Sequence, residues 1–268
     1  MFNKYQNSII LRVLKRIKGN PIDDSTRLVT VGDGTKNVMI GFQTLPKQML
    51  FYFPQDKFNA AALDFYIDKL IENKWDIHQI QGDETSTKKF AEAYSKKTKK
   101  KFERRMNLVV YKLDELCKPD LPNGKMRPAT LDDMNILPFW AVAFNIECDL
   151  GIEGNCLTTQ RDGIIQRFNA SPGTRFLWEV NGRPVSMAHY EEIADDEANI
   201  SGVYTPPDFR GNKYAFGLVW SICNKIRAKY KNIMLYADAN YPQSNKVYQR
   251  IGFRELFINS QYIFEEAK

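Results

Sequence analysis

The amino-acid sequence predicts an α+β protein of two domains, the second built on a mixed, mostly antiparallel sheet flanked by helices. Its 268 residues exceed one minimal domain and suffice for two domains of ~100–150 residues each. Strand-like and helix-like patterns of apolar residues alternate along the chain. Two strand-like segments are joined by Asn181-Gly182, which is the strongest short signal for a β-hairpin because both residues tolerate positive φ.

The first half of the chain is predicted to alternate strands and helices. Strands are expected over residues 38–42, 49–53, 77–81 and 106–113. Helices are expected over residues 9–17, 58–72 and 85–101. The last of these helices is basic, and a Thr or Ser is its expected N-cap.

A turn-rich segment from Lys118 to Lys125 is the predicted boundary, because it gathers two prolines, an asparagine and a glycine. The sequence therefore predicts an N-terminal α/β domain over 1–120 and a second domain over 125–268. In the second, a strand beginning at Arg127 leads into a helix cap, and further strands are expected over 174–180, 184–191, 198–205, 233–237 and 256–264. Helices are expected over 134–147, 161–168, 214–230 and 244–251. Residues 77–94 and 233–248 share a strand, a polar turn and a helix, so the halves are read as distant repeats.

Charge and cysteine content restrict the function classes. A net charge of +6 and a pI near 9.0 favour anionic partners, either nucleic acid or a phosphorylated cofactor. The basic run Lys96–Arg105 lacks the interleaved aromatic residues of a stacking platform, so nucleic acid is disfavoured and a solvated helix face stays open. The 4 cysteines form no CxxC pair and the 2 histidines lie far apart, so neither a metal site nor a disulfide framework is expected.

No secretory signal is expected in the N-terminal residues, because Arg12 interrupts the apolar run early. No stretch of ~20 apolar residues exists that would cross a membrane. We therefore expect a cytoplasmic protein without a membrane partner. A basic organellar transit peptide is the alternative for the same residues.

The segment from Val203 to Val219 predicts an anion site. A strand ends at Thr205, the two prolines that follow stop it, and a helix begins beyond Gly211. Helix N-termini present unpaired N–H groups and partial positive charge, and Gly211 lets the backbone approach a ligand closely. Arg210 and Lys213 add two cations. A plain strand-turn-helix junction is the alternative.

The segment from Leu235 to Phe253 is the second candidate. Asn240 follows a strand, Ser244 can cap the next helix, and Gly252 suits the position after its end. Ser244 and Tyr248 are four residues apart and lie on one face of that helix. Tyr248 is either a core residue or a hydroxyl donor to a ligand.

Together these two segments resemble the GNAT superfamily of acyl-CoA N-acyltransferases, over about residues 126–266. The pyrophosphate-binding motif of that family, Arg/Gln-x-x-Gly-x-Gly/Ala, matches Arg210-Gly211-Asn212-Lys213-Tyr214-Ala215. A later motif, Asn-x-x-x-Ser-Asn-x-x-Tyr-x-x-x-Gly-Phe, matches residues 240–253. The opening Val-Tyr-Thr-Pro-Pro is similar to the glycine N-acyltransferase branch and to bacterial two-domain predicted acetyltransferases. The resemblance implies a GNAT fold in the second domain and a degenerate GNAT-like copy in the first. Lys213 departs from the motif, since a glycine usually stands there.

The resemblance also implies an activity, the direct transfer of an acetyl group from acetyl-CoA to a primary amine. Backbone groups of Val203, Tyr204 and Thr205 would pair with the pantetheine arm, and residues 210–215 would bind the pyrophosphate. Asn240, Ser244 and Asn245 would hold the cofactor from the opposite side. Tyr248 would be the general acid that protonates the departing thiolate.

The general base is expected among the polar residues near the end of the central strand. Glu191 is the first choice, and Glu192, Asp195 and His189 are alternatives, as is a solvated acidic turn without a catalytic role. The acceptor stays open among small amines, amino acids and peptide termini, and a homodimer is also left open. Two other functions remain as alternatives: a non-catalytic CoA-binding or regulatory module, and a nucleic-acid-binding protein.

Overall fold

The computed structural model describes residues 26–45, 47–53, 58–150 and 154–265. The chain divides into two compact units. Unit 1 comprises residues 1–109 and 257–268, and unit 2 comprises residues 110–256. The amphipathic helix predicted over residues 9–17 lies outside the described residues.

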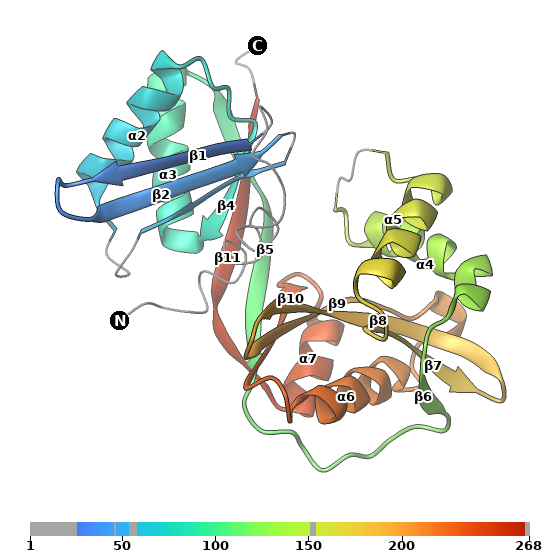
Figure 1. The fold of residues 1–268 in the computed structure, drawn as a ribbon. Coiled ribbons are helices and arrows are strands. Elements are labelled where there is room, and N and C mark those ends of the chain that lie inside the picture. The colour runs from blue at the N-terminus through green and yellow to red at the C-terminus, as the bar shows by residue number, and fades with distance from the viewer. Residues whose placement is uncertain (1–25, 46, 54–57, 151–153, 266–268) are drawn as a thin grey trace. The chain divides into compact units, whose positions relative to one another are not determined.

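Unit 1 is a sheet with two helices on one face. Its strands are β1 (Thr26–Gly32), β2 (Asn37–Thr44), β3 (Met49–Tyr52), β4 (Gln79–Asp83), and the parts of β5 (Lys101–Leu113) and β11 (Phe253–Glu265) that belong to it. They lie in the order β1-β2-β3-β4-β11-β5. The pair β3 and β4 is parallel, while β1 pairs with β2, β2 with β3 and β4 with β11 in antiparallel fashion. The helices are α2 (Ala60–Glu72) and α3 (Glu84–Thr98), and Figure 1 shows them side by side.

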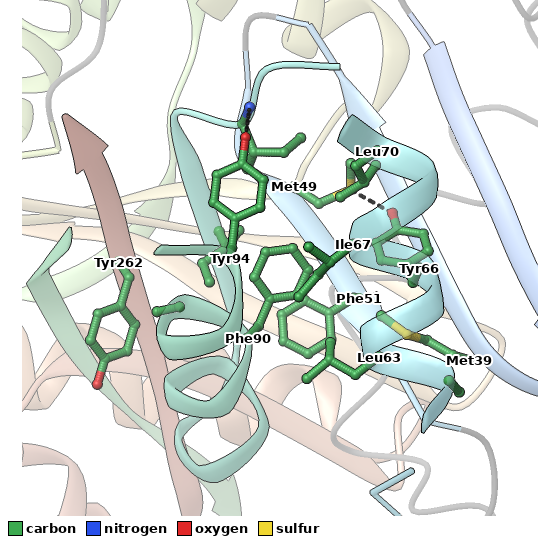
Figure 2. Close-up of a cluster of buried hydrophobic side chains, with 14 of the residues drawn as sticks. Met39, Met49, Phe51, Leu63, Tyr66, Ile67, Leu70, Phe90, Tyr94 and Tyr262 are labelled. Atoms are coloured by element: carbon green, nitrogen blue, oxygen red, sulfur yellow. Dashed lines mark hydrogen bonds between the residues drawn. The ribbon is translucent and has the colours of Figure 1, made fainter. Parts of the chain in front are cut away.

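The core of unit 1 is aromatic and lies between these helices and the sheet. Figure 2 shows Phe51 of β3 against Phe90 of α3, with ring centroids 5.1 Å apart. Leu63 and Ile67 of α2 are spaced one helical turn apart and pack in the same cluster. Tyr66 is buried as well, and its hydroxyl donates to the Met49 sulfur at 3.3 Å. The apolar helical spacing that predicts α2 thus corresponds to its buried face.

Unit 2 places helices on both faces of its sheet. Its strands are β6 (Lys125–Pro128), β7 (Arg175–Val180), β8 (Arg183–Ala194), β9 (Glu197–Tyr204) and β10 (Asn232–Asp238), with the remaining parts of β5 and β11. Neighbours from β6 to β9 are antiparallel, and β10 is parallel to β9. Its α-helices are α4 (Leu137–Glu147), α5 (Leu157–Ala170), α6 (Tyr214–Ile226) and α7 (Pro242–Ile251), and short 3-10 turns lie at Leu131–Asn135 and Pro207–Phe209. In Figure 1, α4 and α5 cover one face, and α6 and α7 cover the other.

Side chains that alternate along the strands of unit 2 separate the two faces. Leu177, Met187 and Tyr204 pack against residues of α4 and α5. On the opposite face, α6 passes so close to Trp178 that a Cβ at Gly217 would lie 3.0 Å from the indole. Because successive strand residues point to opposite faces, Arg175 and His189 lie on the α4/α5 face, two positions from Leu177 and Met187.

Most predicted elements are confirmed within a few residues. Asn181 and Gly182 have φ values of 50° and 76°, as the predicted hairpin turn requires, and Gly252 ends α7 with a φ of 116°. Two cap predictions are wrong. Asp83 caps α3, because its carboxylate accepts from the Ser86 N–H at 2.9 Å. Helix α7 begins at Pro242, so Ser244 lies inside its first turn.

The two compact units are divided within the long strand β5, between residues 109 and 110, and again within β11. The domain bounds predicted from the sequence, 1–120 and 125–268, stay a prediction. The C-terminal end of β11 returns to unit 1, where residues 259–263 pair with β4. Each unit contains a parallel strand pair, followed by a helix and a strand of 13 residues. That similarity agrees with the predicted repeat, and the degenerate GNAT-like origin of unit 1 stays a prediction.

Candidate active site

The strands β9 and β10 of unit 2 separate at one end. Their parallel pairing runs from Glu197 and Asn232 to Ile200 and Leu235, and goes no further. Residues 201–204 of β9 therefore have one edge that pairs with no described strand. The end of β9 is fixed from its other side, because Ser186 donates to the Tyr204 carbonyl at 3.0 Å and accepts from the Thr205 hydroxyl at 2.9 Å. An extended ligand can hydrogen-bond along this open edge as an added strand would.

A β-bulge lies where the separation begins. Met187 pairs with Tyr204 and His189 with Ser201, so Gly202 and Val203 together oppose the single residue between Met187 and His189. Gly202 has a φ of 60°, and a Cβ there would lie 2.7 Å from imidazole atoms of His189. Only glycine fits, and the imidazole packs directly against the bulge.

The loop before α6 has alternating backbone conformations. Gly211 and Lys213 have φ values of 82° and 60°, while Asn212 and Tyr214 are outside the positive-φ region. Such alternation turns successive N–H groups toward one side, forming an anion-binding concavity. Helix α6 begins at Tyr214 without a side-chain cap, so N–H groups of its first turn face the same loop. Apart from Gly211 and its chain neighbours, no atom of the described residues lies within 4 Å of the place where a Gly211 Cβ would stand, which leaves room for a ligand.

Lys213 adopts a left-handed backbone conformation, which glycine adopts more readily than other residues. This conformation is strained for a residue with a Cβ, by roughly 1–2 kcal/mol. The Lys213 ammonium pairs with the Asp120 carboxylate at 2.6 Å, and this hydrogen bond holds the pKa of Asp120 below its ordinary value. The Lys213 side chain is thus directed toward the segment that contains Asp120.

Arg210 forms an ion pair with Glu147, a residue that was not predicted from the sequence to belong to the site. Its Nη2 donates to Glu147 Oε2 at 2.5 Å, and its Nε donates to the Thr205 carbonyl at 2.9 Å. Glu147 also accepts from the Tyr204 hydroxyl at 3.0 Å, and its carbonyl accepts from the Tyr241 hydroxyl at 2.9 Å. Glu147 is the one charged residue of the apolar helix α4, which is the signal that could have found it.

Tyr248 lies on α7 and is 8% exposed. Its ring centroid is 6.2 Å from that of Tyr111 and 6.3 Å from that of Phe253. Burial, followed by the nearby Cys148 and Tyr111, raises the pKa of Tyr248 above its ordinary value. No described residue hydrogen-bonds its hydroxyl. The phenol is therefore held in its protonated form with its proton available.

The other residues predicted for this segment form hydrogen bonds within the protein. The Asn245 amide donates to the carbonyls of Asp238 and Tyr241, both at 2.8 Å, and its oxygen accepts from Tyr111 at 2.9 Å. It ties the end of β10 to α7. Ser244 donates to the Tyr241 carbonyl at 2.9 Å, and the Asn240 N–H donates to Asp238 at 2.8 Å. Their predicted contacts with a cofactor stay predictions.

The candidate bases separate into two groups. Glu192 accepts from Lys229 at 2.7 Å and from Tyr230, and Asp195 lies in the exposed turn after β8. Glu191 instead lies beside His189, with Oε1 3.8 Å from Nε2. The other nitrogen of His189, Nδ1, is 3.4 Å from Nη1 of Arg175. Because arginine can only donate, Nδ1 accepts and the ring proton is on Nε2, toward Glu191.

His189 is neutral at ordinary pH. Its side chain is 14% exposed, and burial, with a smaller contribution from Arg175, lowers its pKa to about 4. With both nitrogens engaged, the imidazole has no lone pair to offer a substrate. Glu191 is then the residue of this pair that can accept a proton.

Comparison with known proteins identifies this part of the chain. Residues 142–253 match the model of the acetyltransferase (GNAT) family. This stretch is a GNAT domain. The matched residues include both motifs, the bulge, the loop before α6 and Tyr248. The relation to the glycine N-acyltransferase branch stays a prediction.

Solved structures show the same fold over nearly the whole chain. A GNAT-family acetyltransferase from Colwellia psychrerythraea has 11% identity and a TM-score of 0.62, with 97% of this chain and 96% of that chain covered. A GCN5-related N-acetyltransferase from Sphaerobacter thermophilus has 16% identity and a TM-score of 0.64, with 93% and 83% covered. One from Kribbella flavida has 15% identity and a TM-score of 0.61, with 97% and 96% covered. No curated protein matches the chain. The predicted fold class is confirmed, a mixed sheet flanked by helices.

The described ranges contain no group of three or more His, Cys, Asp or Glu residues placed to hold a metal ion. Within the same ranges, no helix combines the length and apolar character needed to span a membrane.

Proposed function

We propose that the GNAT domain is an N-acetyltransferase that transfers the acetyl group of acetyl-CoA directly to a primary amine. One observation carries this proposal: the loop with alternating φ at Gly211 and Lys213 opens at the N-terminus of α6, beside the unpaired edge of β9. A phosphate-bearing ligand with an extended polar arm fits both features.

The residues present fit coenzyme A in two places. Backbone groups of Val203 and Thr205 would pair with the pantetheine arm, since β10 no longer occupies that edge. The N–H groups from Gly211 to Ala215 would bind the pyrophosphate, aided by the positive end of α6. Arg210 would exchange its contact with Glu147 for one with phosphate.

Tyr248 would act as the general acid. The amine nitrogen would attack the thioester carbonyl, the carbon–sulfur bond would break, and the nitrogen would release its extra proton to solvent as the amide forms. Tyr248 then donates its proton to the departing thiolate. A phenol with a pKa near 10 or above can protonate a thiolate whose conjugate acid lies near ~8.5 only if the two atoms are in hydrogen-bond reach. Burial of Tyr248 serves this role by keeping the proton on the oxygen.

Glu191 would act as the general base. A free ammonium group with a pKa near ~10.4 is almost fully charged at neutral pH and must lose a proton before it attacks. Glu191 would take this proton. His189 would position the carboxylate by presenting its Nε2 proton, while its packing against Gly202 keeps the bulge in place.

The test is calorimetric titration of the full chain with acetyl-CoA. The Gly211→Asp variant adds a negative side chain at the anion loop and should weaken binding at least tenfold. Gly34→Asp is the matched control, because Gly34 also has positive φ and open space around it, but lies in unit 1. Absence of binding by the wild type, or equal loss in both variants, would overturn the proposal. Amine-dependent release of free thiol then separates a transferase from a module that only binds the cofactor.

A further inference from the structure

A buried arginine lies on the α4/α5 face without an acidic partner. Arg175 is 7% exposed, and with the described residues its guanidinium makes a single hydrogen bond, the 3.4 Å contact with His189. Among the described residues, no carboxylate forms an ion pair with it. A guanidinium has five N–H donors, so most of its hydrogen-bonding capacity is unused.

Such a group is costly to keep. A buried charge that has lost its partner strongly destabilises a protein, because its lost hydration is not compensated. Burial, followed by the nearby Arg167, lowers the pKa of Arg175 to about 10, so the side chain is still positive at neutral pH. The second arginine makes the surroundings more positive. An anion at this position would relieve both effects.

Two hydrogen-bond acceptors, Glu191 and Asn199, lie on the same face, on the far side of His189. Arg175 pairs with His189 across β7 and β8, and Glu191 pairs with Asn199 across β8 and β9. Directly opposed residues of antiparallel strands share a face, and residues two apart on one strand do so as well. Asn199 is 3% exposed, and its side-chain oxygen has no hydrogen-bond partner among the described residues.

We propose that this face binds an acceptor whose amine lies a few bonds from a carboxylate, as in a free amino acid. The carboxylate pairs with Arg175, and the amine lies at Glu191 and Asn199. Arg175 and Glu191 contact the two nitrogens of one imidazole ring, so the cation and the carboxylate are held a single ring apart. That spacing complements a compact zwitterion. The assignment rests on the proposed function, because it takes the bound molecule to be the acetyl acceptor.

The arrangement also selects against other amines. An amine without a carboxylate leaves the guanidinium buried and unpaired. Sites built to pair with a polar group reject analogues that lack it by factors as large as ~10⁴–10⁵. Partial exposure of Arg175 to water reduces this factor, so we expect about a 100-fold preference.

The experiment compares matched acceptors. Thiol release from acetyl-CoA is measured with the full chain for a panel of L-amino acids and for their primary amides. The amide keeps the amine and removes only the anion, and its amine is less basic, so protonation cannot explain a preference for the acid. The wild type should favour the acid in kcat/KM by about 100-fold. Equal use of acids and amides would overturn the proposal, without the need for any variant.

Variants test whether the preference for the acid depends on Arg175. Arg175→Gln should lower kcat/KM for the acid about 100-fold and leave that for the amide within a few-fold, while Arg167→Gln should cause a smaller loss. Arg161→Gln is the matched control, since it removes an exposed arginine from the same helix, α5. An equal loss for acid and amide in Arg175→Gln would indicate a merely structural role and would also overturn the proposal.

Failure of the proposed function is distinguishable from failure of this inference. If acetyl-CoA binds in the calorimeter and amides are acetylated as well as acids, the function stands and the inference falls. If acetyl-CoA does not bind, the proposed function falls. Direct titration with the same acids and amides then decides, because only Arg175-dependent binding of the acid supports a carboxylate site.

Discussion

Arg210 and Glu147 form an ion pair of 2.5 Å that connects the loop before α6 to the end of α4. The arginine is the first residue of the cofactor motif, so a bound pyrophosphate and Glu147 would compete for the same guanidinium. Both side chains are substantially exposed, and exposed ion pairs contribute only about 0–1 kcal/mol to stability. The contact therefore affects cofactor affinity more than folding.

Replacing Glu147 with Gln should strengthen acetyl-CoA binding. The substitution keeps the size of the side chain and its bond with Tyr204, but removes the competing charge. We expect a few-fold gain in affinity, larger at low ionic strength because salt screens exposed charges. Calorimetric titration at two salt concentrations checks this. Asp114→Asn, which breaks the exposed pair with Arg254, is the control. Weaker binding by Glu147→Gln would show that Glu147 orients Arg210 for the cofactor.

Replacing Tyr248 with Phe should lower kcat by about 10²–10⁴-fold and leave acetyl-CoA affinity nearly unchanged, since general acid catalysis contributes on that scale. In the proposed mechanism activity requires the protonated phenol, whose pKa is raised, so wild-type kcat should show no loss from this group up to about pH 10. Tyr262→Phe, at a buried tyrosine of β11, is the control. Unchanged turnover in Tyr248→Phe would remove the role.

Local patterns in the sequence predicted most elements because those elements obey local rules. Asn181-Gly182 requires positive φ at both residues, and α2 and α7 have one apolar face. Strand β1 was missed because it is largely half-exposed, with Val31 its only buried residue. Its position depends on pairing with β2, which no pattern within Thr26–Gly32 encodes.

For a related reason, only part of the candidate site can be recognised from the sequence. The candidate cofactor motif is contiguous in the sequence, and its loop depends on local backbone conformation at Gly211 and Lys213. Glu147 lies 63 residues from its partner Arg210, and Arg175 is an ordinary arginine at the start of a strand. Their significance arises only from burial and from partners on other strands or helices. Single-sequence patterns carry no record of these long-range contacts.

Acid should destabilise unit 2 through His189. Its pKa in the folded state is about 4, below the ~6.5 of an unfolded histidine. The neutral imidazole therefore contributes stability that is fully present above pH ~6.5 and is lost as the pH falls through about 4. From 1.36 kcal/mol per pKa unit, the loss approaches about 3 kcal/mol. Urea unfolding at pH 7.0, 5.5 and 4.0 measures it.

Two variants isolate this contribution, because the chain has only 2 histidines. His189→Gln should lose less stability between pH 7.0 and 4.0 than the wild type does. His78 is exposed, so His78→Gln should keep the wild-type pH dependence. If His189→Gln follows the wild-type curve, the imidazole is not held in its neutral form by the fold.

Replacing Gly202 with Ala should destabilise unit 2 and reduce activity together. The added Cβ would lie 2.7 Å from the His189 ring and would require positive φ, so we expect a loss of about 2–4 kcal/mol from overpacking and strain. The clash is with the imidazole, so removing the ring should relieve it. In a double-mutant cycle, Gly202→Ala should cost at least ~1 kcal/mol less in the His189→Ala background than in the wild type. Urea unfolding of the four proteins gives the coupling energy. Additive losses would mean that backbone strain alone explains the glycine, and that the imidazole is not held against the bulge as the proposed role of Glu191 requires.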